Sequence, residues 1–255
     1  MPTRTARTAL GLVPTVTACL FDLDGVLTQT AKVHAAAWKQ IFDEYLRAKA
    51  TRTGQPFKPF GKVNDYDTYV DGKSREDGVR AFLGSRHLSL PEGSDADSPD
   101  AETVHGLAIR KDRLFLDLIR KRGVDPYKGS VRYVQAAREA GLRLAVVSSS
   151  KNCTEVLRAA GIHGLFDAQV DGNVAEARRL IGKPAPDTYL AAAKMLRKSA
   201  HQCAVYEDAL AGVEAGRAGG FGLVIGIDRV GQANALRKHG ADIVVSDLAD
   251  LLKSR

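Results

Sequence analysis

The sequence predicts an α/β fold in which a doubly wound parallel sheet is interrupted, near its start, by an inserted block of helices. From residue 131 to residue 245, short apolar runs alternate with helical patterns, which is typical of a parallel sheet with helices on both faces. Residues 33–122 instead carry apolar residues at helical spacing and contain no convincing strand. We therefore expect an α/β core domain over residues 1–32 and 123–255 and an α-helical cap domain over residues 33–122.

The first strand of the core is expected to end at Phe21. Apolar residues alternate with others over Val16–Leu20 and lead into a short buried run, which a glycine turn closes. The cap then begins with a helix whose apolar side chains recur every four residues: Val33, Ala37, Ile41 and Tyr45. Further helical patterns cover residues 79–83 and 107–119, and a turn-rich stretch over residues 91–99 separates them.

After the cap, the chain returns to an alternation of helices and strands. The apolar spacing predicts helices at 131–140, 154–160, 188–198 and 210–218 and strands at 142–147, 203–206, 223–227 and 242–245. Residues 171–182 are expected to form a long loop. The strands of this series would all lie in the same parallel sheet as the first one.

Length and hydropathy argue against a membrane or secreted protein. With 255 residues, 44% of them hydrophobic, the chain can bury a substantial core. No apolar run approaches the roughly 20 residues of a membrane span, and residues 1–8 lack the apolar segment of a secretion signal. We therefore expect a cytoplasmic protein with no membrane contact, whose Arg4 and Arg7 lie in a solvated tail.

Charge and cysteine usage narrow the class further. The net charge of +7 is spread along the chain and aromatic residues make up only 6%, so we expect an anionic small substrate rather than nucleic acid. We also expect a monomer. The six histidines show neither HxH nor HExxH spacing, so no zinc site is expected. Cys19, Cys153 and Cys203 form no CxxC pair and are expected to be buried free thiols.

Four short polar clusters give the strongest indication of function. Each follows an apolar run, and they cover residues 21–26, 148–151, 182–184 and 206–208. Because ligands of doubly wound sheets bind outside the carboxyl ends of the strands, we expect the clusters to lie where an active site should be. In an extended chain, residues i and i+2 project to the same side, so Asp22 and Asp24 would face one point, about 7 Å apart along the chain.

Two carboxylates placed in this way need a cation. Mg²⁺ prefers carboxylate, carbonyl and water oxygens and bridges to substrate phosphates, and Glu207 and Asp208 supply further oxygen ligands. A carboxylate assisted by a metal can attack a phosphoryl group and form an aspartyl-phosphate. We expect Asp22 to be this nucleophile and Asp24 to be the general acid and base for the leaving or attacking hydroxyl.

Ser148 and Lys183 are expected to hold the transferring phosphate. The Ser148 hydroxyl and the neighbouring backbone amides are suited to stabilising charge in the transition state. Residues 148–150 also suit a helix cap, and the two roles are compatible. Lys183 precedes a helix that proline can open, and its ammonium can bridge Asp22 and the phosphate. Taken alone, Lys183 would be interpreted as a solvated lysine, and its position in the series favours the functional role.

The clusters resemble the four motifs of the haloacid dehalogenase (HAD) superfamily of phosphotransferases, over nearly the whole chain. Within that superfamily, the chain is similar to the β-phosphoglucomutase subgroup. The residues that carry the resemblance are 21–27, His34, Trp38, 72–77, Arg110, Lys111, 148–152, 183–187, Glu207 and Asp208. The resemblance implies a Rossmann-like HAD core with a helical cap.

The resemblance also implies an activity and a set of ligands. Members of the subgroup are Mg²⁺ enzymes that move a phosphate between the 1 and 6 positions of β-glucose through a sugar 1,6-bisphosphate, which serves as primer. By position, the metal would be bound by Asp22, Glu207, Asp208 and the backbone of Asp24. The phosphosugar would contact a second set of residues: His34, Gly72, Ser74, Arg75, Lys111, Ser150, Lys151 and Asn152.

Within that second set, three residues have more specific implied roles. Arg75 would hold the distal phosphate, because a guanidinium fork binds phosphate through two hydrogen bonds. Lys111 would reach down from the cap, and His34 would couple cap closure to the position of the acid.

Several positions depart from the pattern of the subgroup. Asp112 stands where relatives usually have Asn, and residues 108–109 are Ala-Ile in place of Gly-Asn. Ala209 replaces a Ser and Gln29 replaces an Asp, and neither change removes a proposed chemical group. The cap also carries extra residues at about 84–102, and residues 171–182 lengthen the loop before Lys183.

Three functions compete on this evidence. The leading hypothesis is a β-phosphoglucomutase-like phosphosugar mutase, and the first alternative is a HAD-type phosphatase that hydrolyses small sugar phosphates at the same site. A non-catalytic sugar-phosphate-binding protein is less favoured, because clustered carboxylates are unfavourable without a cation. A dehalogenase is disfavoured by Asp24, since such enzymes have no leaving alcohol to protonate.

Overall fold

The computed structural model describes residues 8–253, so Arg4 and Arg7 lie outside the described residues. The chain divides into two compact units. An α/β unit combines the segment up to Gln29 with the segment from Val124, and a helical unit comprises Thr30–Gly123. The domain limits expected from the sequence, 1–32 with 123–255 and 33–122, stay a prediction.

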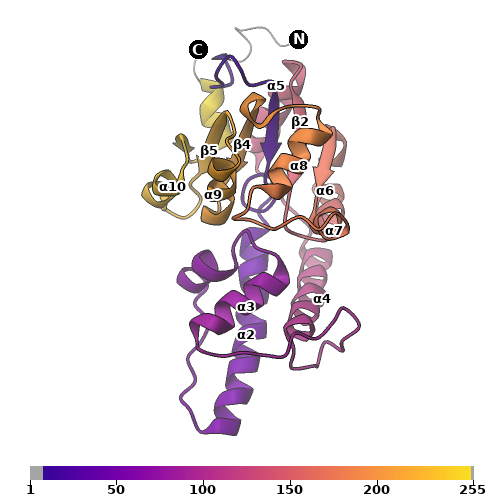
Figure 1. Ribbon diagram of the computed structural model, residues 1–255, viewed down its shortest axis with the longest axis vertical. Helices are drawn as coiled ribbons and strands as arrows, with labels where there is room; N and C mark the ends of the chain where they lie inside the picture. Colours follow the sequence, from indigo (N-terminus) through magenta and orange to yellow (C-terminus); the bar gives the residue numbers. More distant parts are fainter. Residues whose placement is uncertain (1–7, 254–255) are drawn as a thin grey trace. The chain divides into compact units, whose positions relative to one another are not determined.

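The α/β unit is built on a parallel sheet of six strands in the order β3-β2-β1-β4-β5-β6. Figure 1 labels β2, β4 and β5 of this sheet. The strands are β1 (Ala18–Phe21), β2 (Arg143–Val147), β3 (Ala168–Val170), β4 (Cys203–Glu207), β5 (Leu223–Ile227) and β6 (Ile243–Val245). Every neighbouring pair is parallel, from β1 with β2 and β4 outwards to both edges. The predicted parallel α/β class is therefore confirmed.

Helices cover both faces of this sheet. They are α5 (Lys128–Glu139), α6 (Cys153–Ala159), α7 (Gly172–Ala177), α8 (Asp187–Met195), α9 (Leu210–Ala218) and α10 (Ala233–His239). On one face, Leu20 of β1 packs in a buried cluster with Tyr189 of α8 and Val213 of α9. On the opposite face, the next residue, Phe21, lies edge-on to Tyr133 of α5. Alternate residues of the same strand thus pack against different helix layers, which makes the sheet doubly wound.

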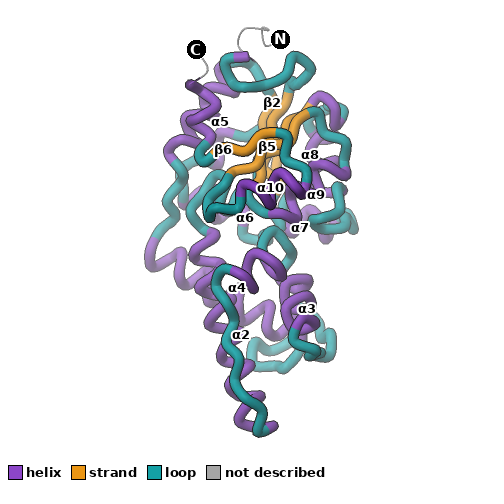
Figure 2. The backbone as a smooth tube through the Cα atoms, turned by 90° about the vertical axis from the view of Figure 1, so that its left-hand side faces the viewer, coloured by secondary structure: helices purple, strands orange, loops and turns teal. Residues whose placement is uncertain are grey.

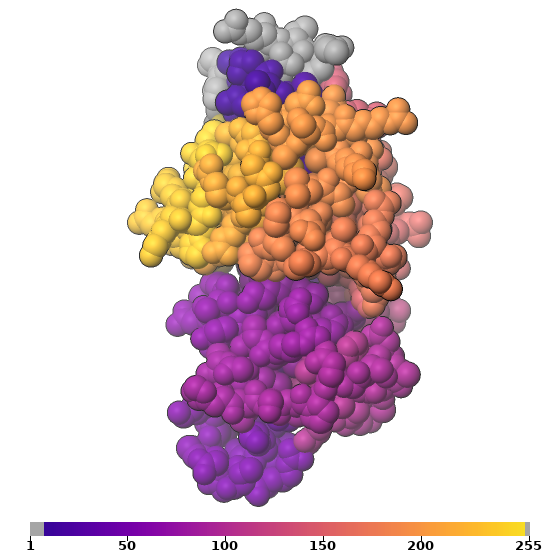
Figure 3. Space-filling model, in the orientation of Figure 1, coloured from indigo at the N-terminus to yellow at the C-terminus, as the bar shows by residue number. Residues whose placement is uncertain are grey.

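Helices α8, α9 and α10 form one outer layer of the α/β unit. In Figure 3 the orange and yellow segments that contain them make up most of the visible surface of the α/β unit. Residues 171–182 were expected to form a long loop, and that expectation is wrong because they contain α7.

Three short elements differ from the sequence prediction. Residues 171–182 contain α7, whose first turn is capped where the Asp171 carboxylate accepts from the Val174 amide at 2.9 Å. Strand β3 precedes it, and α10 follows β5; neither was expected. Each has only three to seven residues, too few for an apolar period to stand out, and β3 carries a polar Gln169 at its centre.

The helical unit contains α2 (Ala31–Thr53), a π-helical turn (Tyr66–Val70), α3 (Arg75–Ser85) and α4 (Val104–Arg122). Residues 30–123 contain no strand, and Figure 2 shows this unit as helices and loops alone. Its core is aromatic: Phe42 packs against Trp38, Phe60 and Phe82 with ring centroids 4.2–5.2 Å apart. The connection from α3 to α4, residues 86–103, has no regular structure. Among the described helices, none has the length and apolar character needed to cross a membrane.

Candidate active site

Three neighbouring strands end at the same edge of the sheet. Strand β1 pairs with β2 on one side and β4 on the other, so the residues that follow them, Asp22 and Ser148, lie beside Glu207 at the end of β4. The amide of Asp22 donates to the Tyr206 carbonyl at 3.0 Å, which continues the ladder past the end of β1. The predicted clusters are therefore brought together because parallel strands expose their carboxyl ends in one row.

Lys183 lies between two carboxylates. Its Nζ is 2.5 Å from Asp22 Oδ1 and 2.5 Å from Glu207 Oε1, and 3.4 Å from the Val147 carbonyl. All three charged side chains are buried, Lys183 with 4% of its surface exposed and Glu207 with none. A lysine is almost never buried unless it is paired, so the solvated reading of Lys183 does not hold in this structure.

Two further groups fix Glu207, and the sequence did not identify either. The Tyr189 hydroxyl of α8 donates to Glu207 Oε1 at 2.9 Å, and the Ala209 amide donates to Oε2 at 3.1 Å. Lys183 Nζ also lies 5.0 Å from the centre of the Tyr189 ring. Burial, followed by the negative charge of Glu207, raises the pKa of Tyr189 well above its usual value, so its hydroxyl stays a donor.

Burial and charge set the protonation of this cluster. Burial raises the pKa of Asp22 well above its usual range; the charge of Lys183 opposes the rise, and the charges of Glu207 and Asp24 add to it. Burial alone would lower the pKa of Lys183, but Asp22 and Glu207 more than offset this, so the pKa of Lys183 is raised. Lys183 is therefore a permanent cation at this site.

One ammonium does not neutralise the acidic groups present. Oxygen atoms of Asp22, Glu207 and Asp208 lie within 4.8 Å of one another, and all three residues are buried. Buried carboxylates at such spacing repel one another unless a cation lies among them. A set of oxygen ligands without nitrogen or sulfur fits a hard divalent cation such as Mg²⁺.

The turn after β1 carries Asp24 and packs closely against Asp208, which follows β4. Gly25 has φ +87°, and a Cβ there would lie 1.7 Å from Asp208 Oδ2, so only glycine fits. The turn is closed where the Gly25 amide donates to the Thr28 carbonyl at 2.8 Å. Asp24 is partly exposed, in contrast to Asp22, which is compatible with the acid and base role expected for it from the sequence.

The loop after β2 is held by its own serines. Ser148 Oγ accepts from the Ser150 amide and Ser150 Oγ from the Asn152 amide, each at 3.1 Å. Helix α6 follows directly, so the loop does resemble a helix-capping segment, although Asn152 makes no side-chain cap hydrogen bond. Lys151, predicted to contact substrate, forms an ion pair with Glu176 of α7 at 3.1 Å.

The helical unit gathers its own predicted residues. Lys111 is 3% exposed, and its Nζ lies 2.6 Å from His34 Nδ1. The same ammonium lies over the rings of Trp38 and Phe115 at 5.2 and 5.0 Å, and His34 stacks on Phe115 at 4.0 Å. Lys111 and His34 are thus fixed as a pair by aromatic packing, although 77 residues separate them in sequence.

Arg75, Ser74 and Gly72 lie at the start of α3. Ser74 caps this helix by accepting from the Asp77 amide at 3.2 Å, and Gly72 has φ +70°, a conformation that favours glycine. Arg75 Nη1 lies 2.6 Å from Asp112 Oδ1 of α4. The position that departs from the subgroup is therefore in direct contact with the predicted phosphate ligand.

A second group of possible metal ligands lies in the helical unit. Nitrogen and oxygen atoms of Glu76, Asp95 and His105 lie within 4.8 Å of one another. Asp95 is exposed, and its Oδ1 lies 3.0 Å from His105 Nδ1, a direct contact that accounts for this grouping without a metal. Sequence spacing gave no sign of it, because the three residues come from separate segments.

A family model described as haloacid dehalogenase-like hydrolase matches residues 16–220. The chain belongs to the HAD superfamily. A protein named β-phosphoglucomutase from Mycobacterium bovis is 53% identical over 95% of this chain and 94% of its own length. A β-phosphoglucomutase from Bacillus subtilis is 34% identical over 92% of this chain and 91% of its own length.

Solved structures agree with this assignment. The crystal structure of β-phosphoglucomutase from Clostridium difficile matches with a TM-score of 0.72 and 25% identity, covering 92% of this chain and 93% of that one. The resemblance to the HAD superfamily and its β-phosphoglucomutase-like subgroup is therefore confirmed. This HAD member is an enzyme, a phosphomutase or a phosphatase.

Proposed function

We propose that the chain is a Mg²⁺-dependent phosphosugar mutase that interconverts β-glucose 1-phosphate and glucose 6-phosphate. The observation that carries the proposal is the buried group of Asp22, Lys183 and Glu207 at the carboxyl edge of the sheet. It joins a nucleophile, a fixed cation and a metal ligand within hydrogen-bond distance. The identity of 53% to a protein named β-phosphoglucomutase supports the choice of substrate.

The proposed reaction begins with a phosphorylated Asp22. The 6-hydroxyl of β-glucose 1-phosphate loses its proton to Asp24 and attacks the phosphorus atom, so the bond from phosphorus to Asp22 breaks and a 1,6-bisphosphate forms. After the bisphosphate turns around, Asp22 attacks the phosphate at position 1 while Asp24 returns the proton to the leaving oxygen. Glucose 6-phosphate is released and Asp22 is phosphorylated again, so each turnover restores the enzyme.

The residues around Asp22 would bind and orient the phosphate. Lys183 would hold both Asp22 and a phosphate oxygen, and the Ser148 hydroxyl and nearby amides would donate to the others. Asp22, Glu207, Asp208 and the backbone of Asp24 would hold Mg²⁺, which supplies charge that offsets the repulsion between two anions. A free sugar 1,6-bisphosphate would load Asp22 before the first turnover.

The second phosphate of the substrate would be bound by residues of the helical unit. We propose that Arg75 supplies a guanidinium fork for this phosphate. The paired side chains of His34 and Lys111 would also contact the substrate. Ser150 and Asn152 would contact the same end of the substrate, with Gly72, Ser74 and Lys151 near them. The side chain of Ser74 already contacts Asp77, and that of Lys151 already contacts Glu176. These contacts favour a role for both residues in holding the local backbone rather than in binding the substrate directly.

A phosphatase is the second candidate function. It would use the same Asp22 and Asp24, with water in place of the sugar hydroxyl, and would need no second phosphate ligand. The ion pair of Arg75 with Asp112 favours it, because this carboxylate competes with a phosphate for the guanidinium.

Phosphorus NMR of β-glucose 1-phosphate with the protein and Mg²⁺ separates the two functions. The mutase predicts that glucose 6-phosphate accumulates, that a trace of glucose 1,6-bisphosphate accelerates its formation, and that little free phosphate appears. Inorganic phosphate as the main product would establish the phosphatase instead. A spectrum that stays unchanged with the primer present would refute this substrate for both functions.

A further inference from the structure

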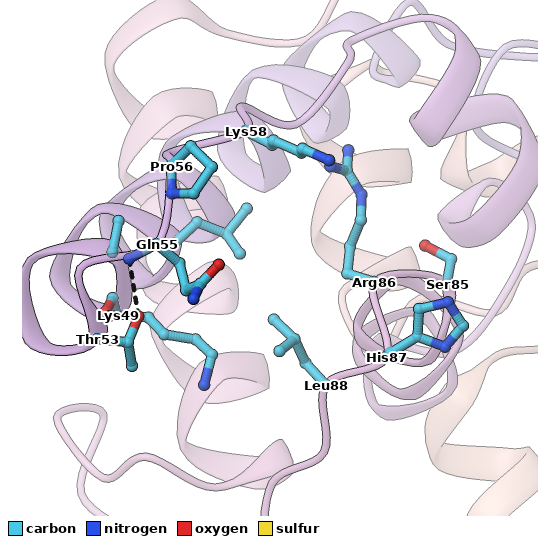
Figure 4. Close-up of a pocket in the computed structure, with 11 residues that line it drawn as sticks. Lys49, Thr53, Gln55, Pro56, Lys58, Ser85, Arg86, His87 and Leu88 are labelled. Carbon is cyan, nitrogen blue, oxygen red and sulfur yellow. Dashed lines mark hydrogen bonds between the residues drawn. The ribbon is translucent and has the colours of Figure 1, made fainter.

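The helical unit contains a cavity of about 490 Å³ that the proposed function does not use. It lies between the C-terminal half of α2, the segment after that helix and the end of α3 (Figure 4). Four of its lining residues are basic: Lys49, Lys58, Arg86 and His87. None of the residues that line it is acidic.

This cavity is distinct from the residues assigned to the phosphosugar. Along α3, Ser85 at the cavity is ten residues from Arg75, a distance of about 15 Å at the rise of a helix. Along α2, Leu46 at the cavity is twelve residues from His34, or about 18 Å. The cavity and the phosphosugar residues therefore lie at opposite ends of the same two helices.

Fixed contacts hold the wall that follows α2. The Gln55 amide donates to Thr53 Oγ1 at 3.4 Å, shown dashed in Figure 4. Next in the chain, Phe57 lies under the Arg47 guanidinium at 5.0 Å. The buried Phe60 then anchors the segment, because its amide donates to Asp43 Oδ1 at 2.8 Å. These three contacts hold the wall in place, and a wall that is already ordered lowers the cost of binding a ligand.

The wall formed by the end of α3 is fixed through Arg86. Its guanidinium donates to the Pro59 carbonyl at 3.3 Å and to Asp65 Oδ2 at 2.7 Å. It also lies over the Phe82 ring at 5.2 Å. These contacts join the α3 wall to the segment after α2.

The charges at the cavity are only partly compensated. Arg86 has Asp65 as its partner, and Lys49 lies near Glu102, whose carboxylate Arg52 already holds through two hydrogen bonds. Neither Lys58 nor His87 forms an ion pair with any described residue. Cations in the last turn of a helix complement its dipole, and in α2 that cation is Arg52. That effect does not extend to Lys58, which lies five residues beyond the helix.

We propose that this cavity binds a small phosphorylated molecule. Figure 4 shows Lys58 and Arg86 converging from two walls, with Lys49 projecting from a third. Ammonium and guanidinium groups arranged in this way suit a phosphate with two negative charges. Leu46, Ala50, Pro56 and Leu88 supply apolar surface for the rest of the ligand, and the volume is within the usual range for small-molecule sites.

The proposal is tested with adenosine monophosphate and pyrophosphate as probes, by calorimetric titration in the presence of EDTA. We expect the double variant Lys49→Ala/Lys58→Ala to lose affinity for both probes by about tenfold or more. The matched control is Lys194→Ala/Lys198→Ala in the α/β unit, one lysine in the last turn of α8 and one three residues after the helix, and this variant should bind as the wild type does. A single Lys58→Gln variant, at an exposed position, serves as a second test with little effect on folding.

Three outcomes would overturn the proposal. The first is that the two double variants bind the probes with equal affinity. The second is that neither probe binds to the wild type at about 10 mM. The third is that citrate binds as tightly as the two phosphates. The last would show a cavity that selects charge alone. Turnover of β-glucose 1-phosphate without probe should stay unchanged in the Lys49→Ala/Lys58→Ala variant. A failure of this proposal can therefore be distinguished from a failure of the proposed mutase function.

Discussion

Arg75 and Asp112 form an ion pair across two helices of the helical unit, with Nη1 and Oδ1 2.6 Å apart. Both side chains are mostly buried, Arg75 with 17% and Asp112 with 23% of their surface exposed. The guanidinium has five donors in a fixed plane, so Asp112 can orient one edge while the other remains available. If Arg75 binds the second phosphate as proposed, the same carboxylate would also repel that phosphate, so the pair would set both the orientation and the affinity of this group.

Asp112→Asn is expected to lower KM for the phosphosugar by about fivefold, corresponding to about 1 kcal/mol. The amide oxygen still accepts from Arg75, but the charge that opposes the phosphate is gone. Initial rates over a range of substrate concentration measure the change. Asp117→Asn on the same helix, where Asp117 pairs with Arg120 at the surface, is the control and should leave KM as it is. A raised KM in Asp112→Asn would mean that orientation of Arg75 outweighs repulsion.

Arg75→Ala is expected to reduce mutase turnover by about 100-fold or more while hydrolysis of a phosphate ester with one phosphate falls much less. Only the mutase must hold a second phosphate while the first is transferred. The two rates are measured on the same preparation, by glucose 6-phosphate formation and by phosphate release. Arg80→Ala, one turn further along α3 and paired with Asp77, is the matched control. Equal losses in both activities would argue against the assigned role of Arg75.

Much of the α/β unit and of its site could be predicted from the sequence. Asp22, Ser148 and Glu207 each end a run of buried residues, and this pattern is visible without a structure. Lys183 was found through its place in the series, and the structure shows it paired. The three cysteines are free and buried, as predicted.

Contacts between distant segments could not be predicted in this way. Tyr189 has the spacing of an ordinary apolar helix residue, and nothing in the sequence indicates that its hydroxyl reaches Glu207. Asp112 and Arg75 belong to different helices, so their ion pair depends on how α3 and α4 pack. Gly212 lies inside a helix, with no turn to mark it. Its importance comes from a close approach to Glu207.

Gly212→Ala is expected to weaken Mg²⁺ binding and turnover together. A Cβ at this position would lie 1.7 Å from Glu207 Oε1, so the carboxylate must move away from Lys183 and Tyr189. Gly84→Ala in α3 is the matched control, because nothing lies within 4 Å of its added Cβ and alanine favours a helix. Thermal unfolding over a range of Mg²⁺ concentrations reports the affinity. An unchanged Mg²⁺ response in Gly212→Ala would show that Glu207 does not contribute to a metal site.

The cysteine thiols are expected to be unreactive in the folded protein. Burial raises the pKa of Cys19 from 9.0 to about 12, and burial likewise raises the pKa of Cys203 to about 12. At pH 8 a thiol reagent should therefore modify none of the three cysteines quickly, and all three after denaturation in guanidinium chloride. Fast reaction of the folded protein would contradict the burial seen here.

The same pKa shifts predict loss of stability in alkali. Between about pH 9 and about pH 12 the unfolded chain releases thiol protons that the folded chain retains, so the unfolded chain binds fewer protons. The free energy of unfolding should fall as the pH rises through this range, and it should be unaffected by these groups below pH 9. Denaturant unfolding of Cys203→Ala and of the wild type at two pH values isolates the contribution of one thiol. A difference in the free energy of unfolding that does not change with pH would argue against this contribution.

Asp22→Asn is expected to abolish turnover and to leave phosphosugar binding largely in place. The side-chain amide of asparagine cannot attack phosphorus to form the aspartyl-phosphate. Lys183 keeps Glu207 as a partner and still presents its ammonium to a phosphate. Binding is measured by calorimetric titration with glucose 6-phosphate, and turnover by phosphorus NMR. Asp125→Asn in the same unit, outside the acidic cluster, should behave as the wild type does. Turnover that persists in Asp22→Asn would remove Asp22 as nucleophile, whereas loss of binding together with turnover would mean that Asp22 holds Lys183 in position for the phosphate.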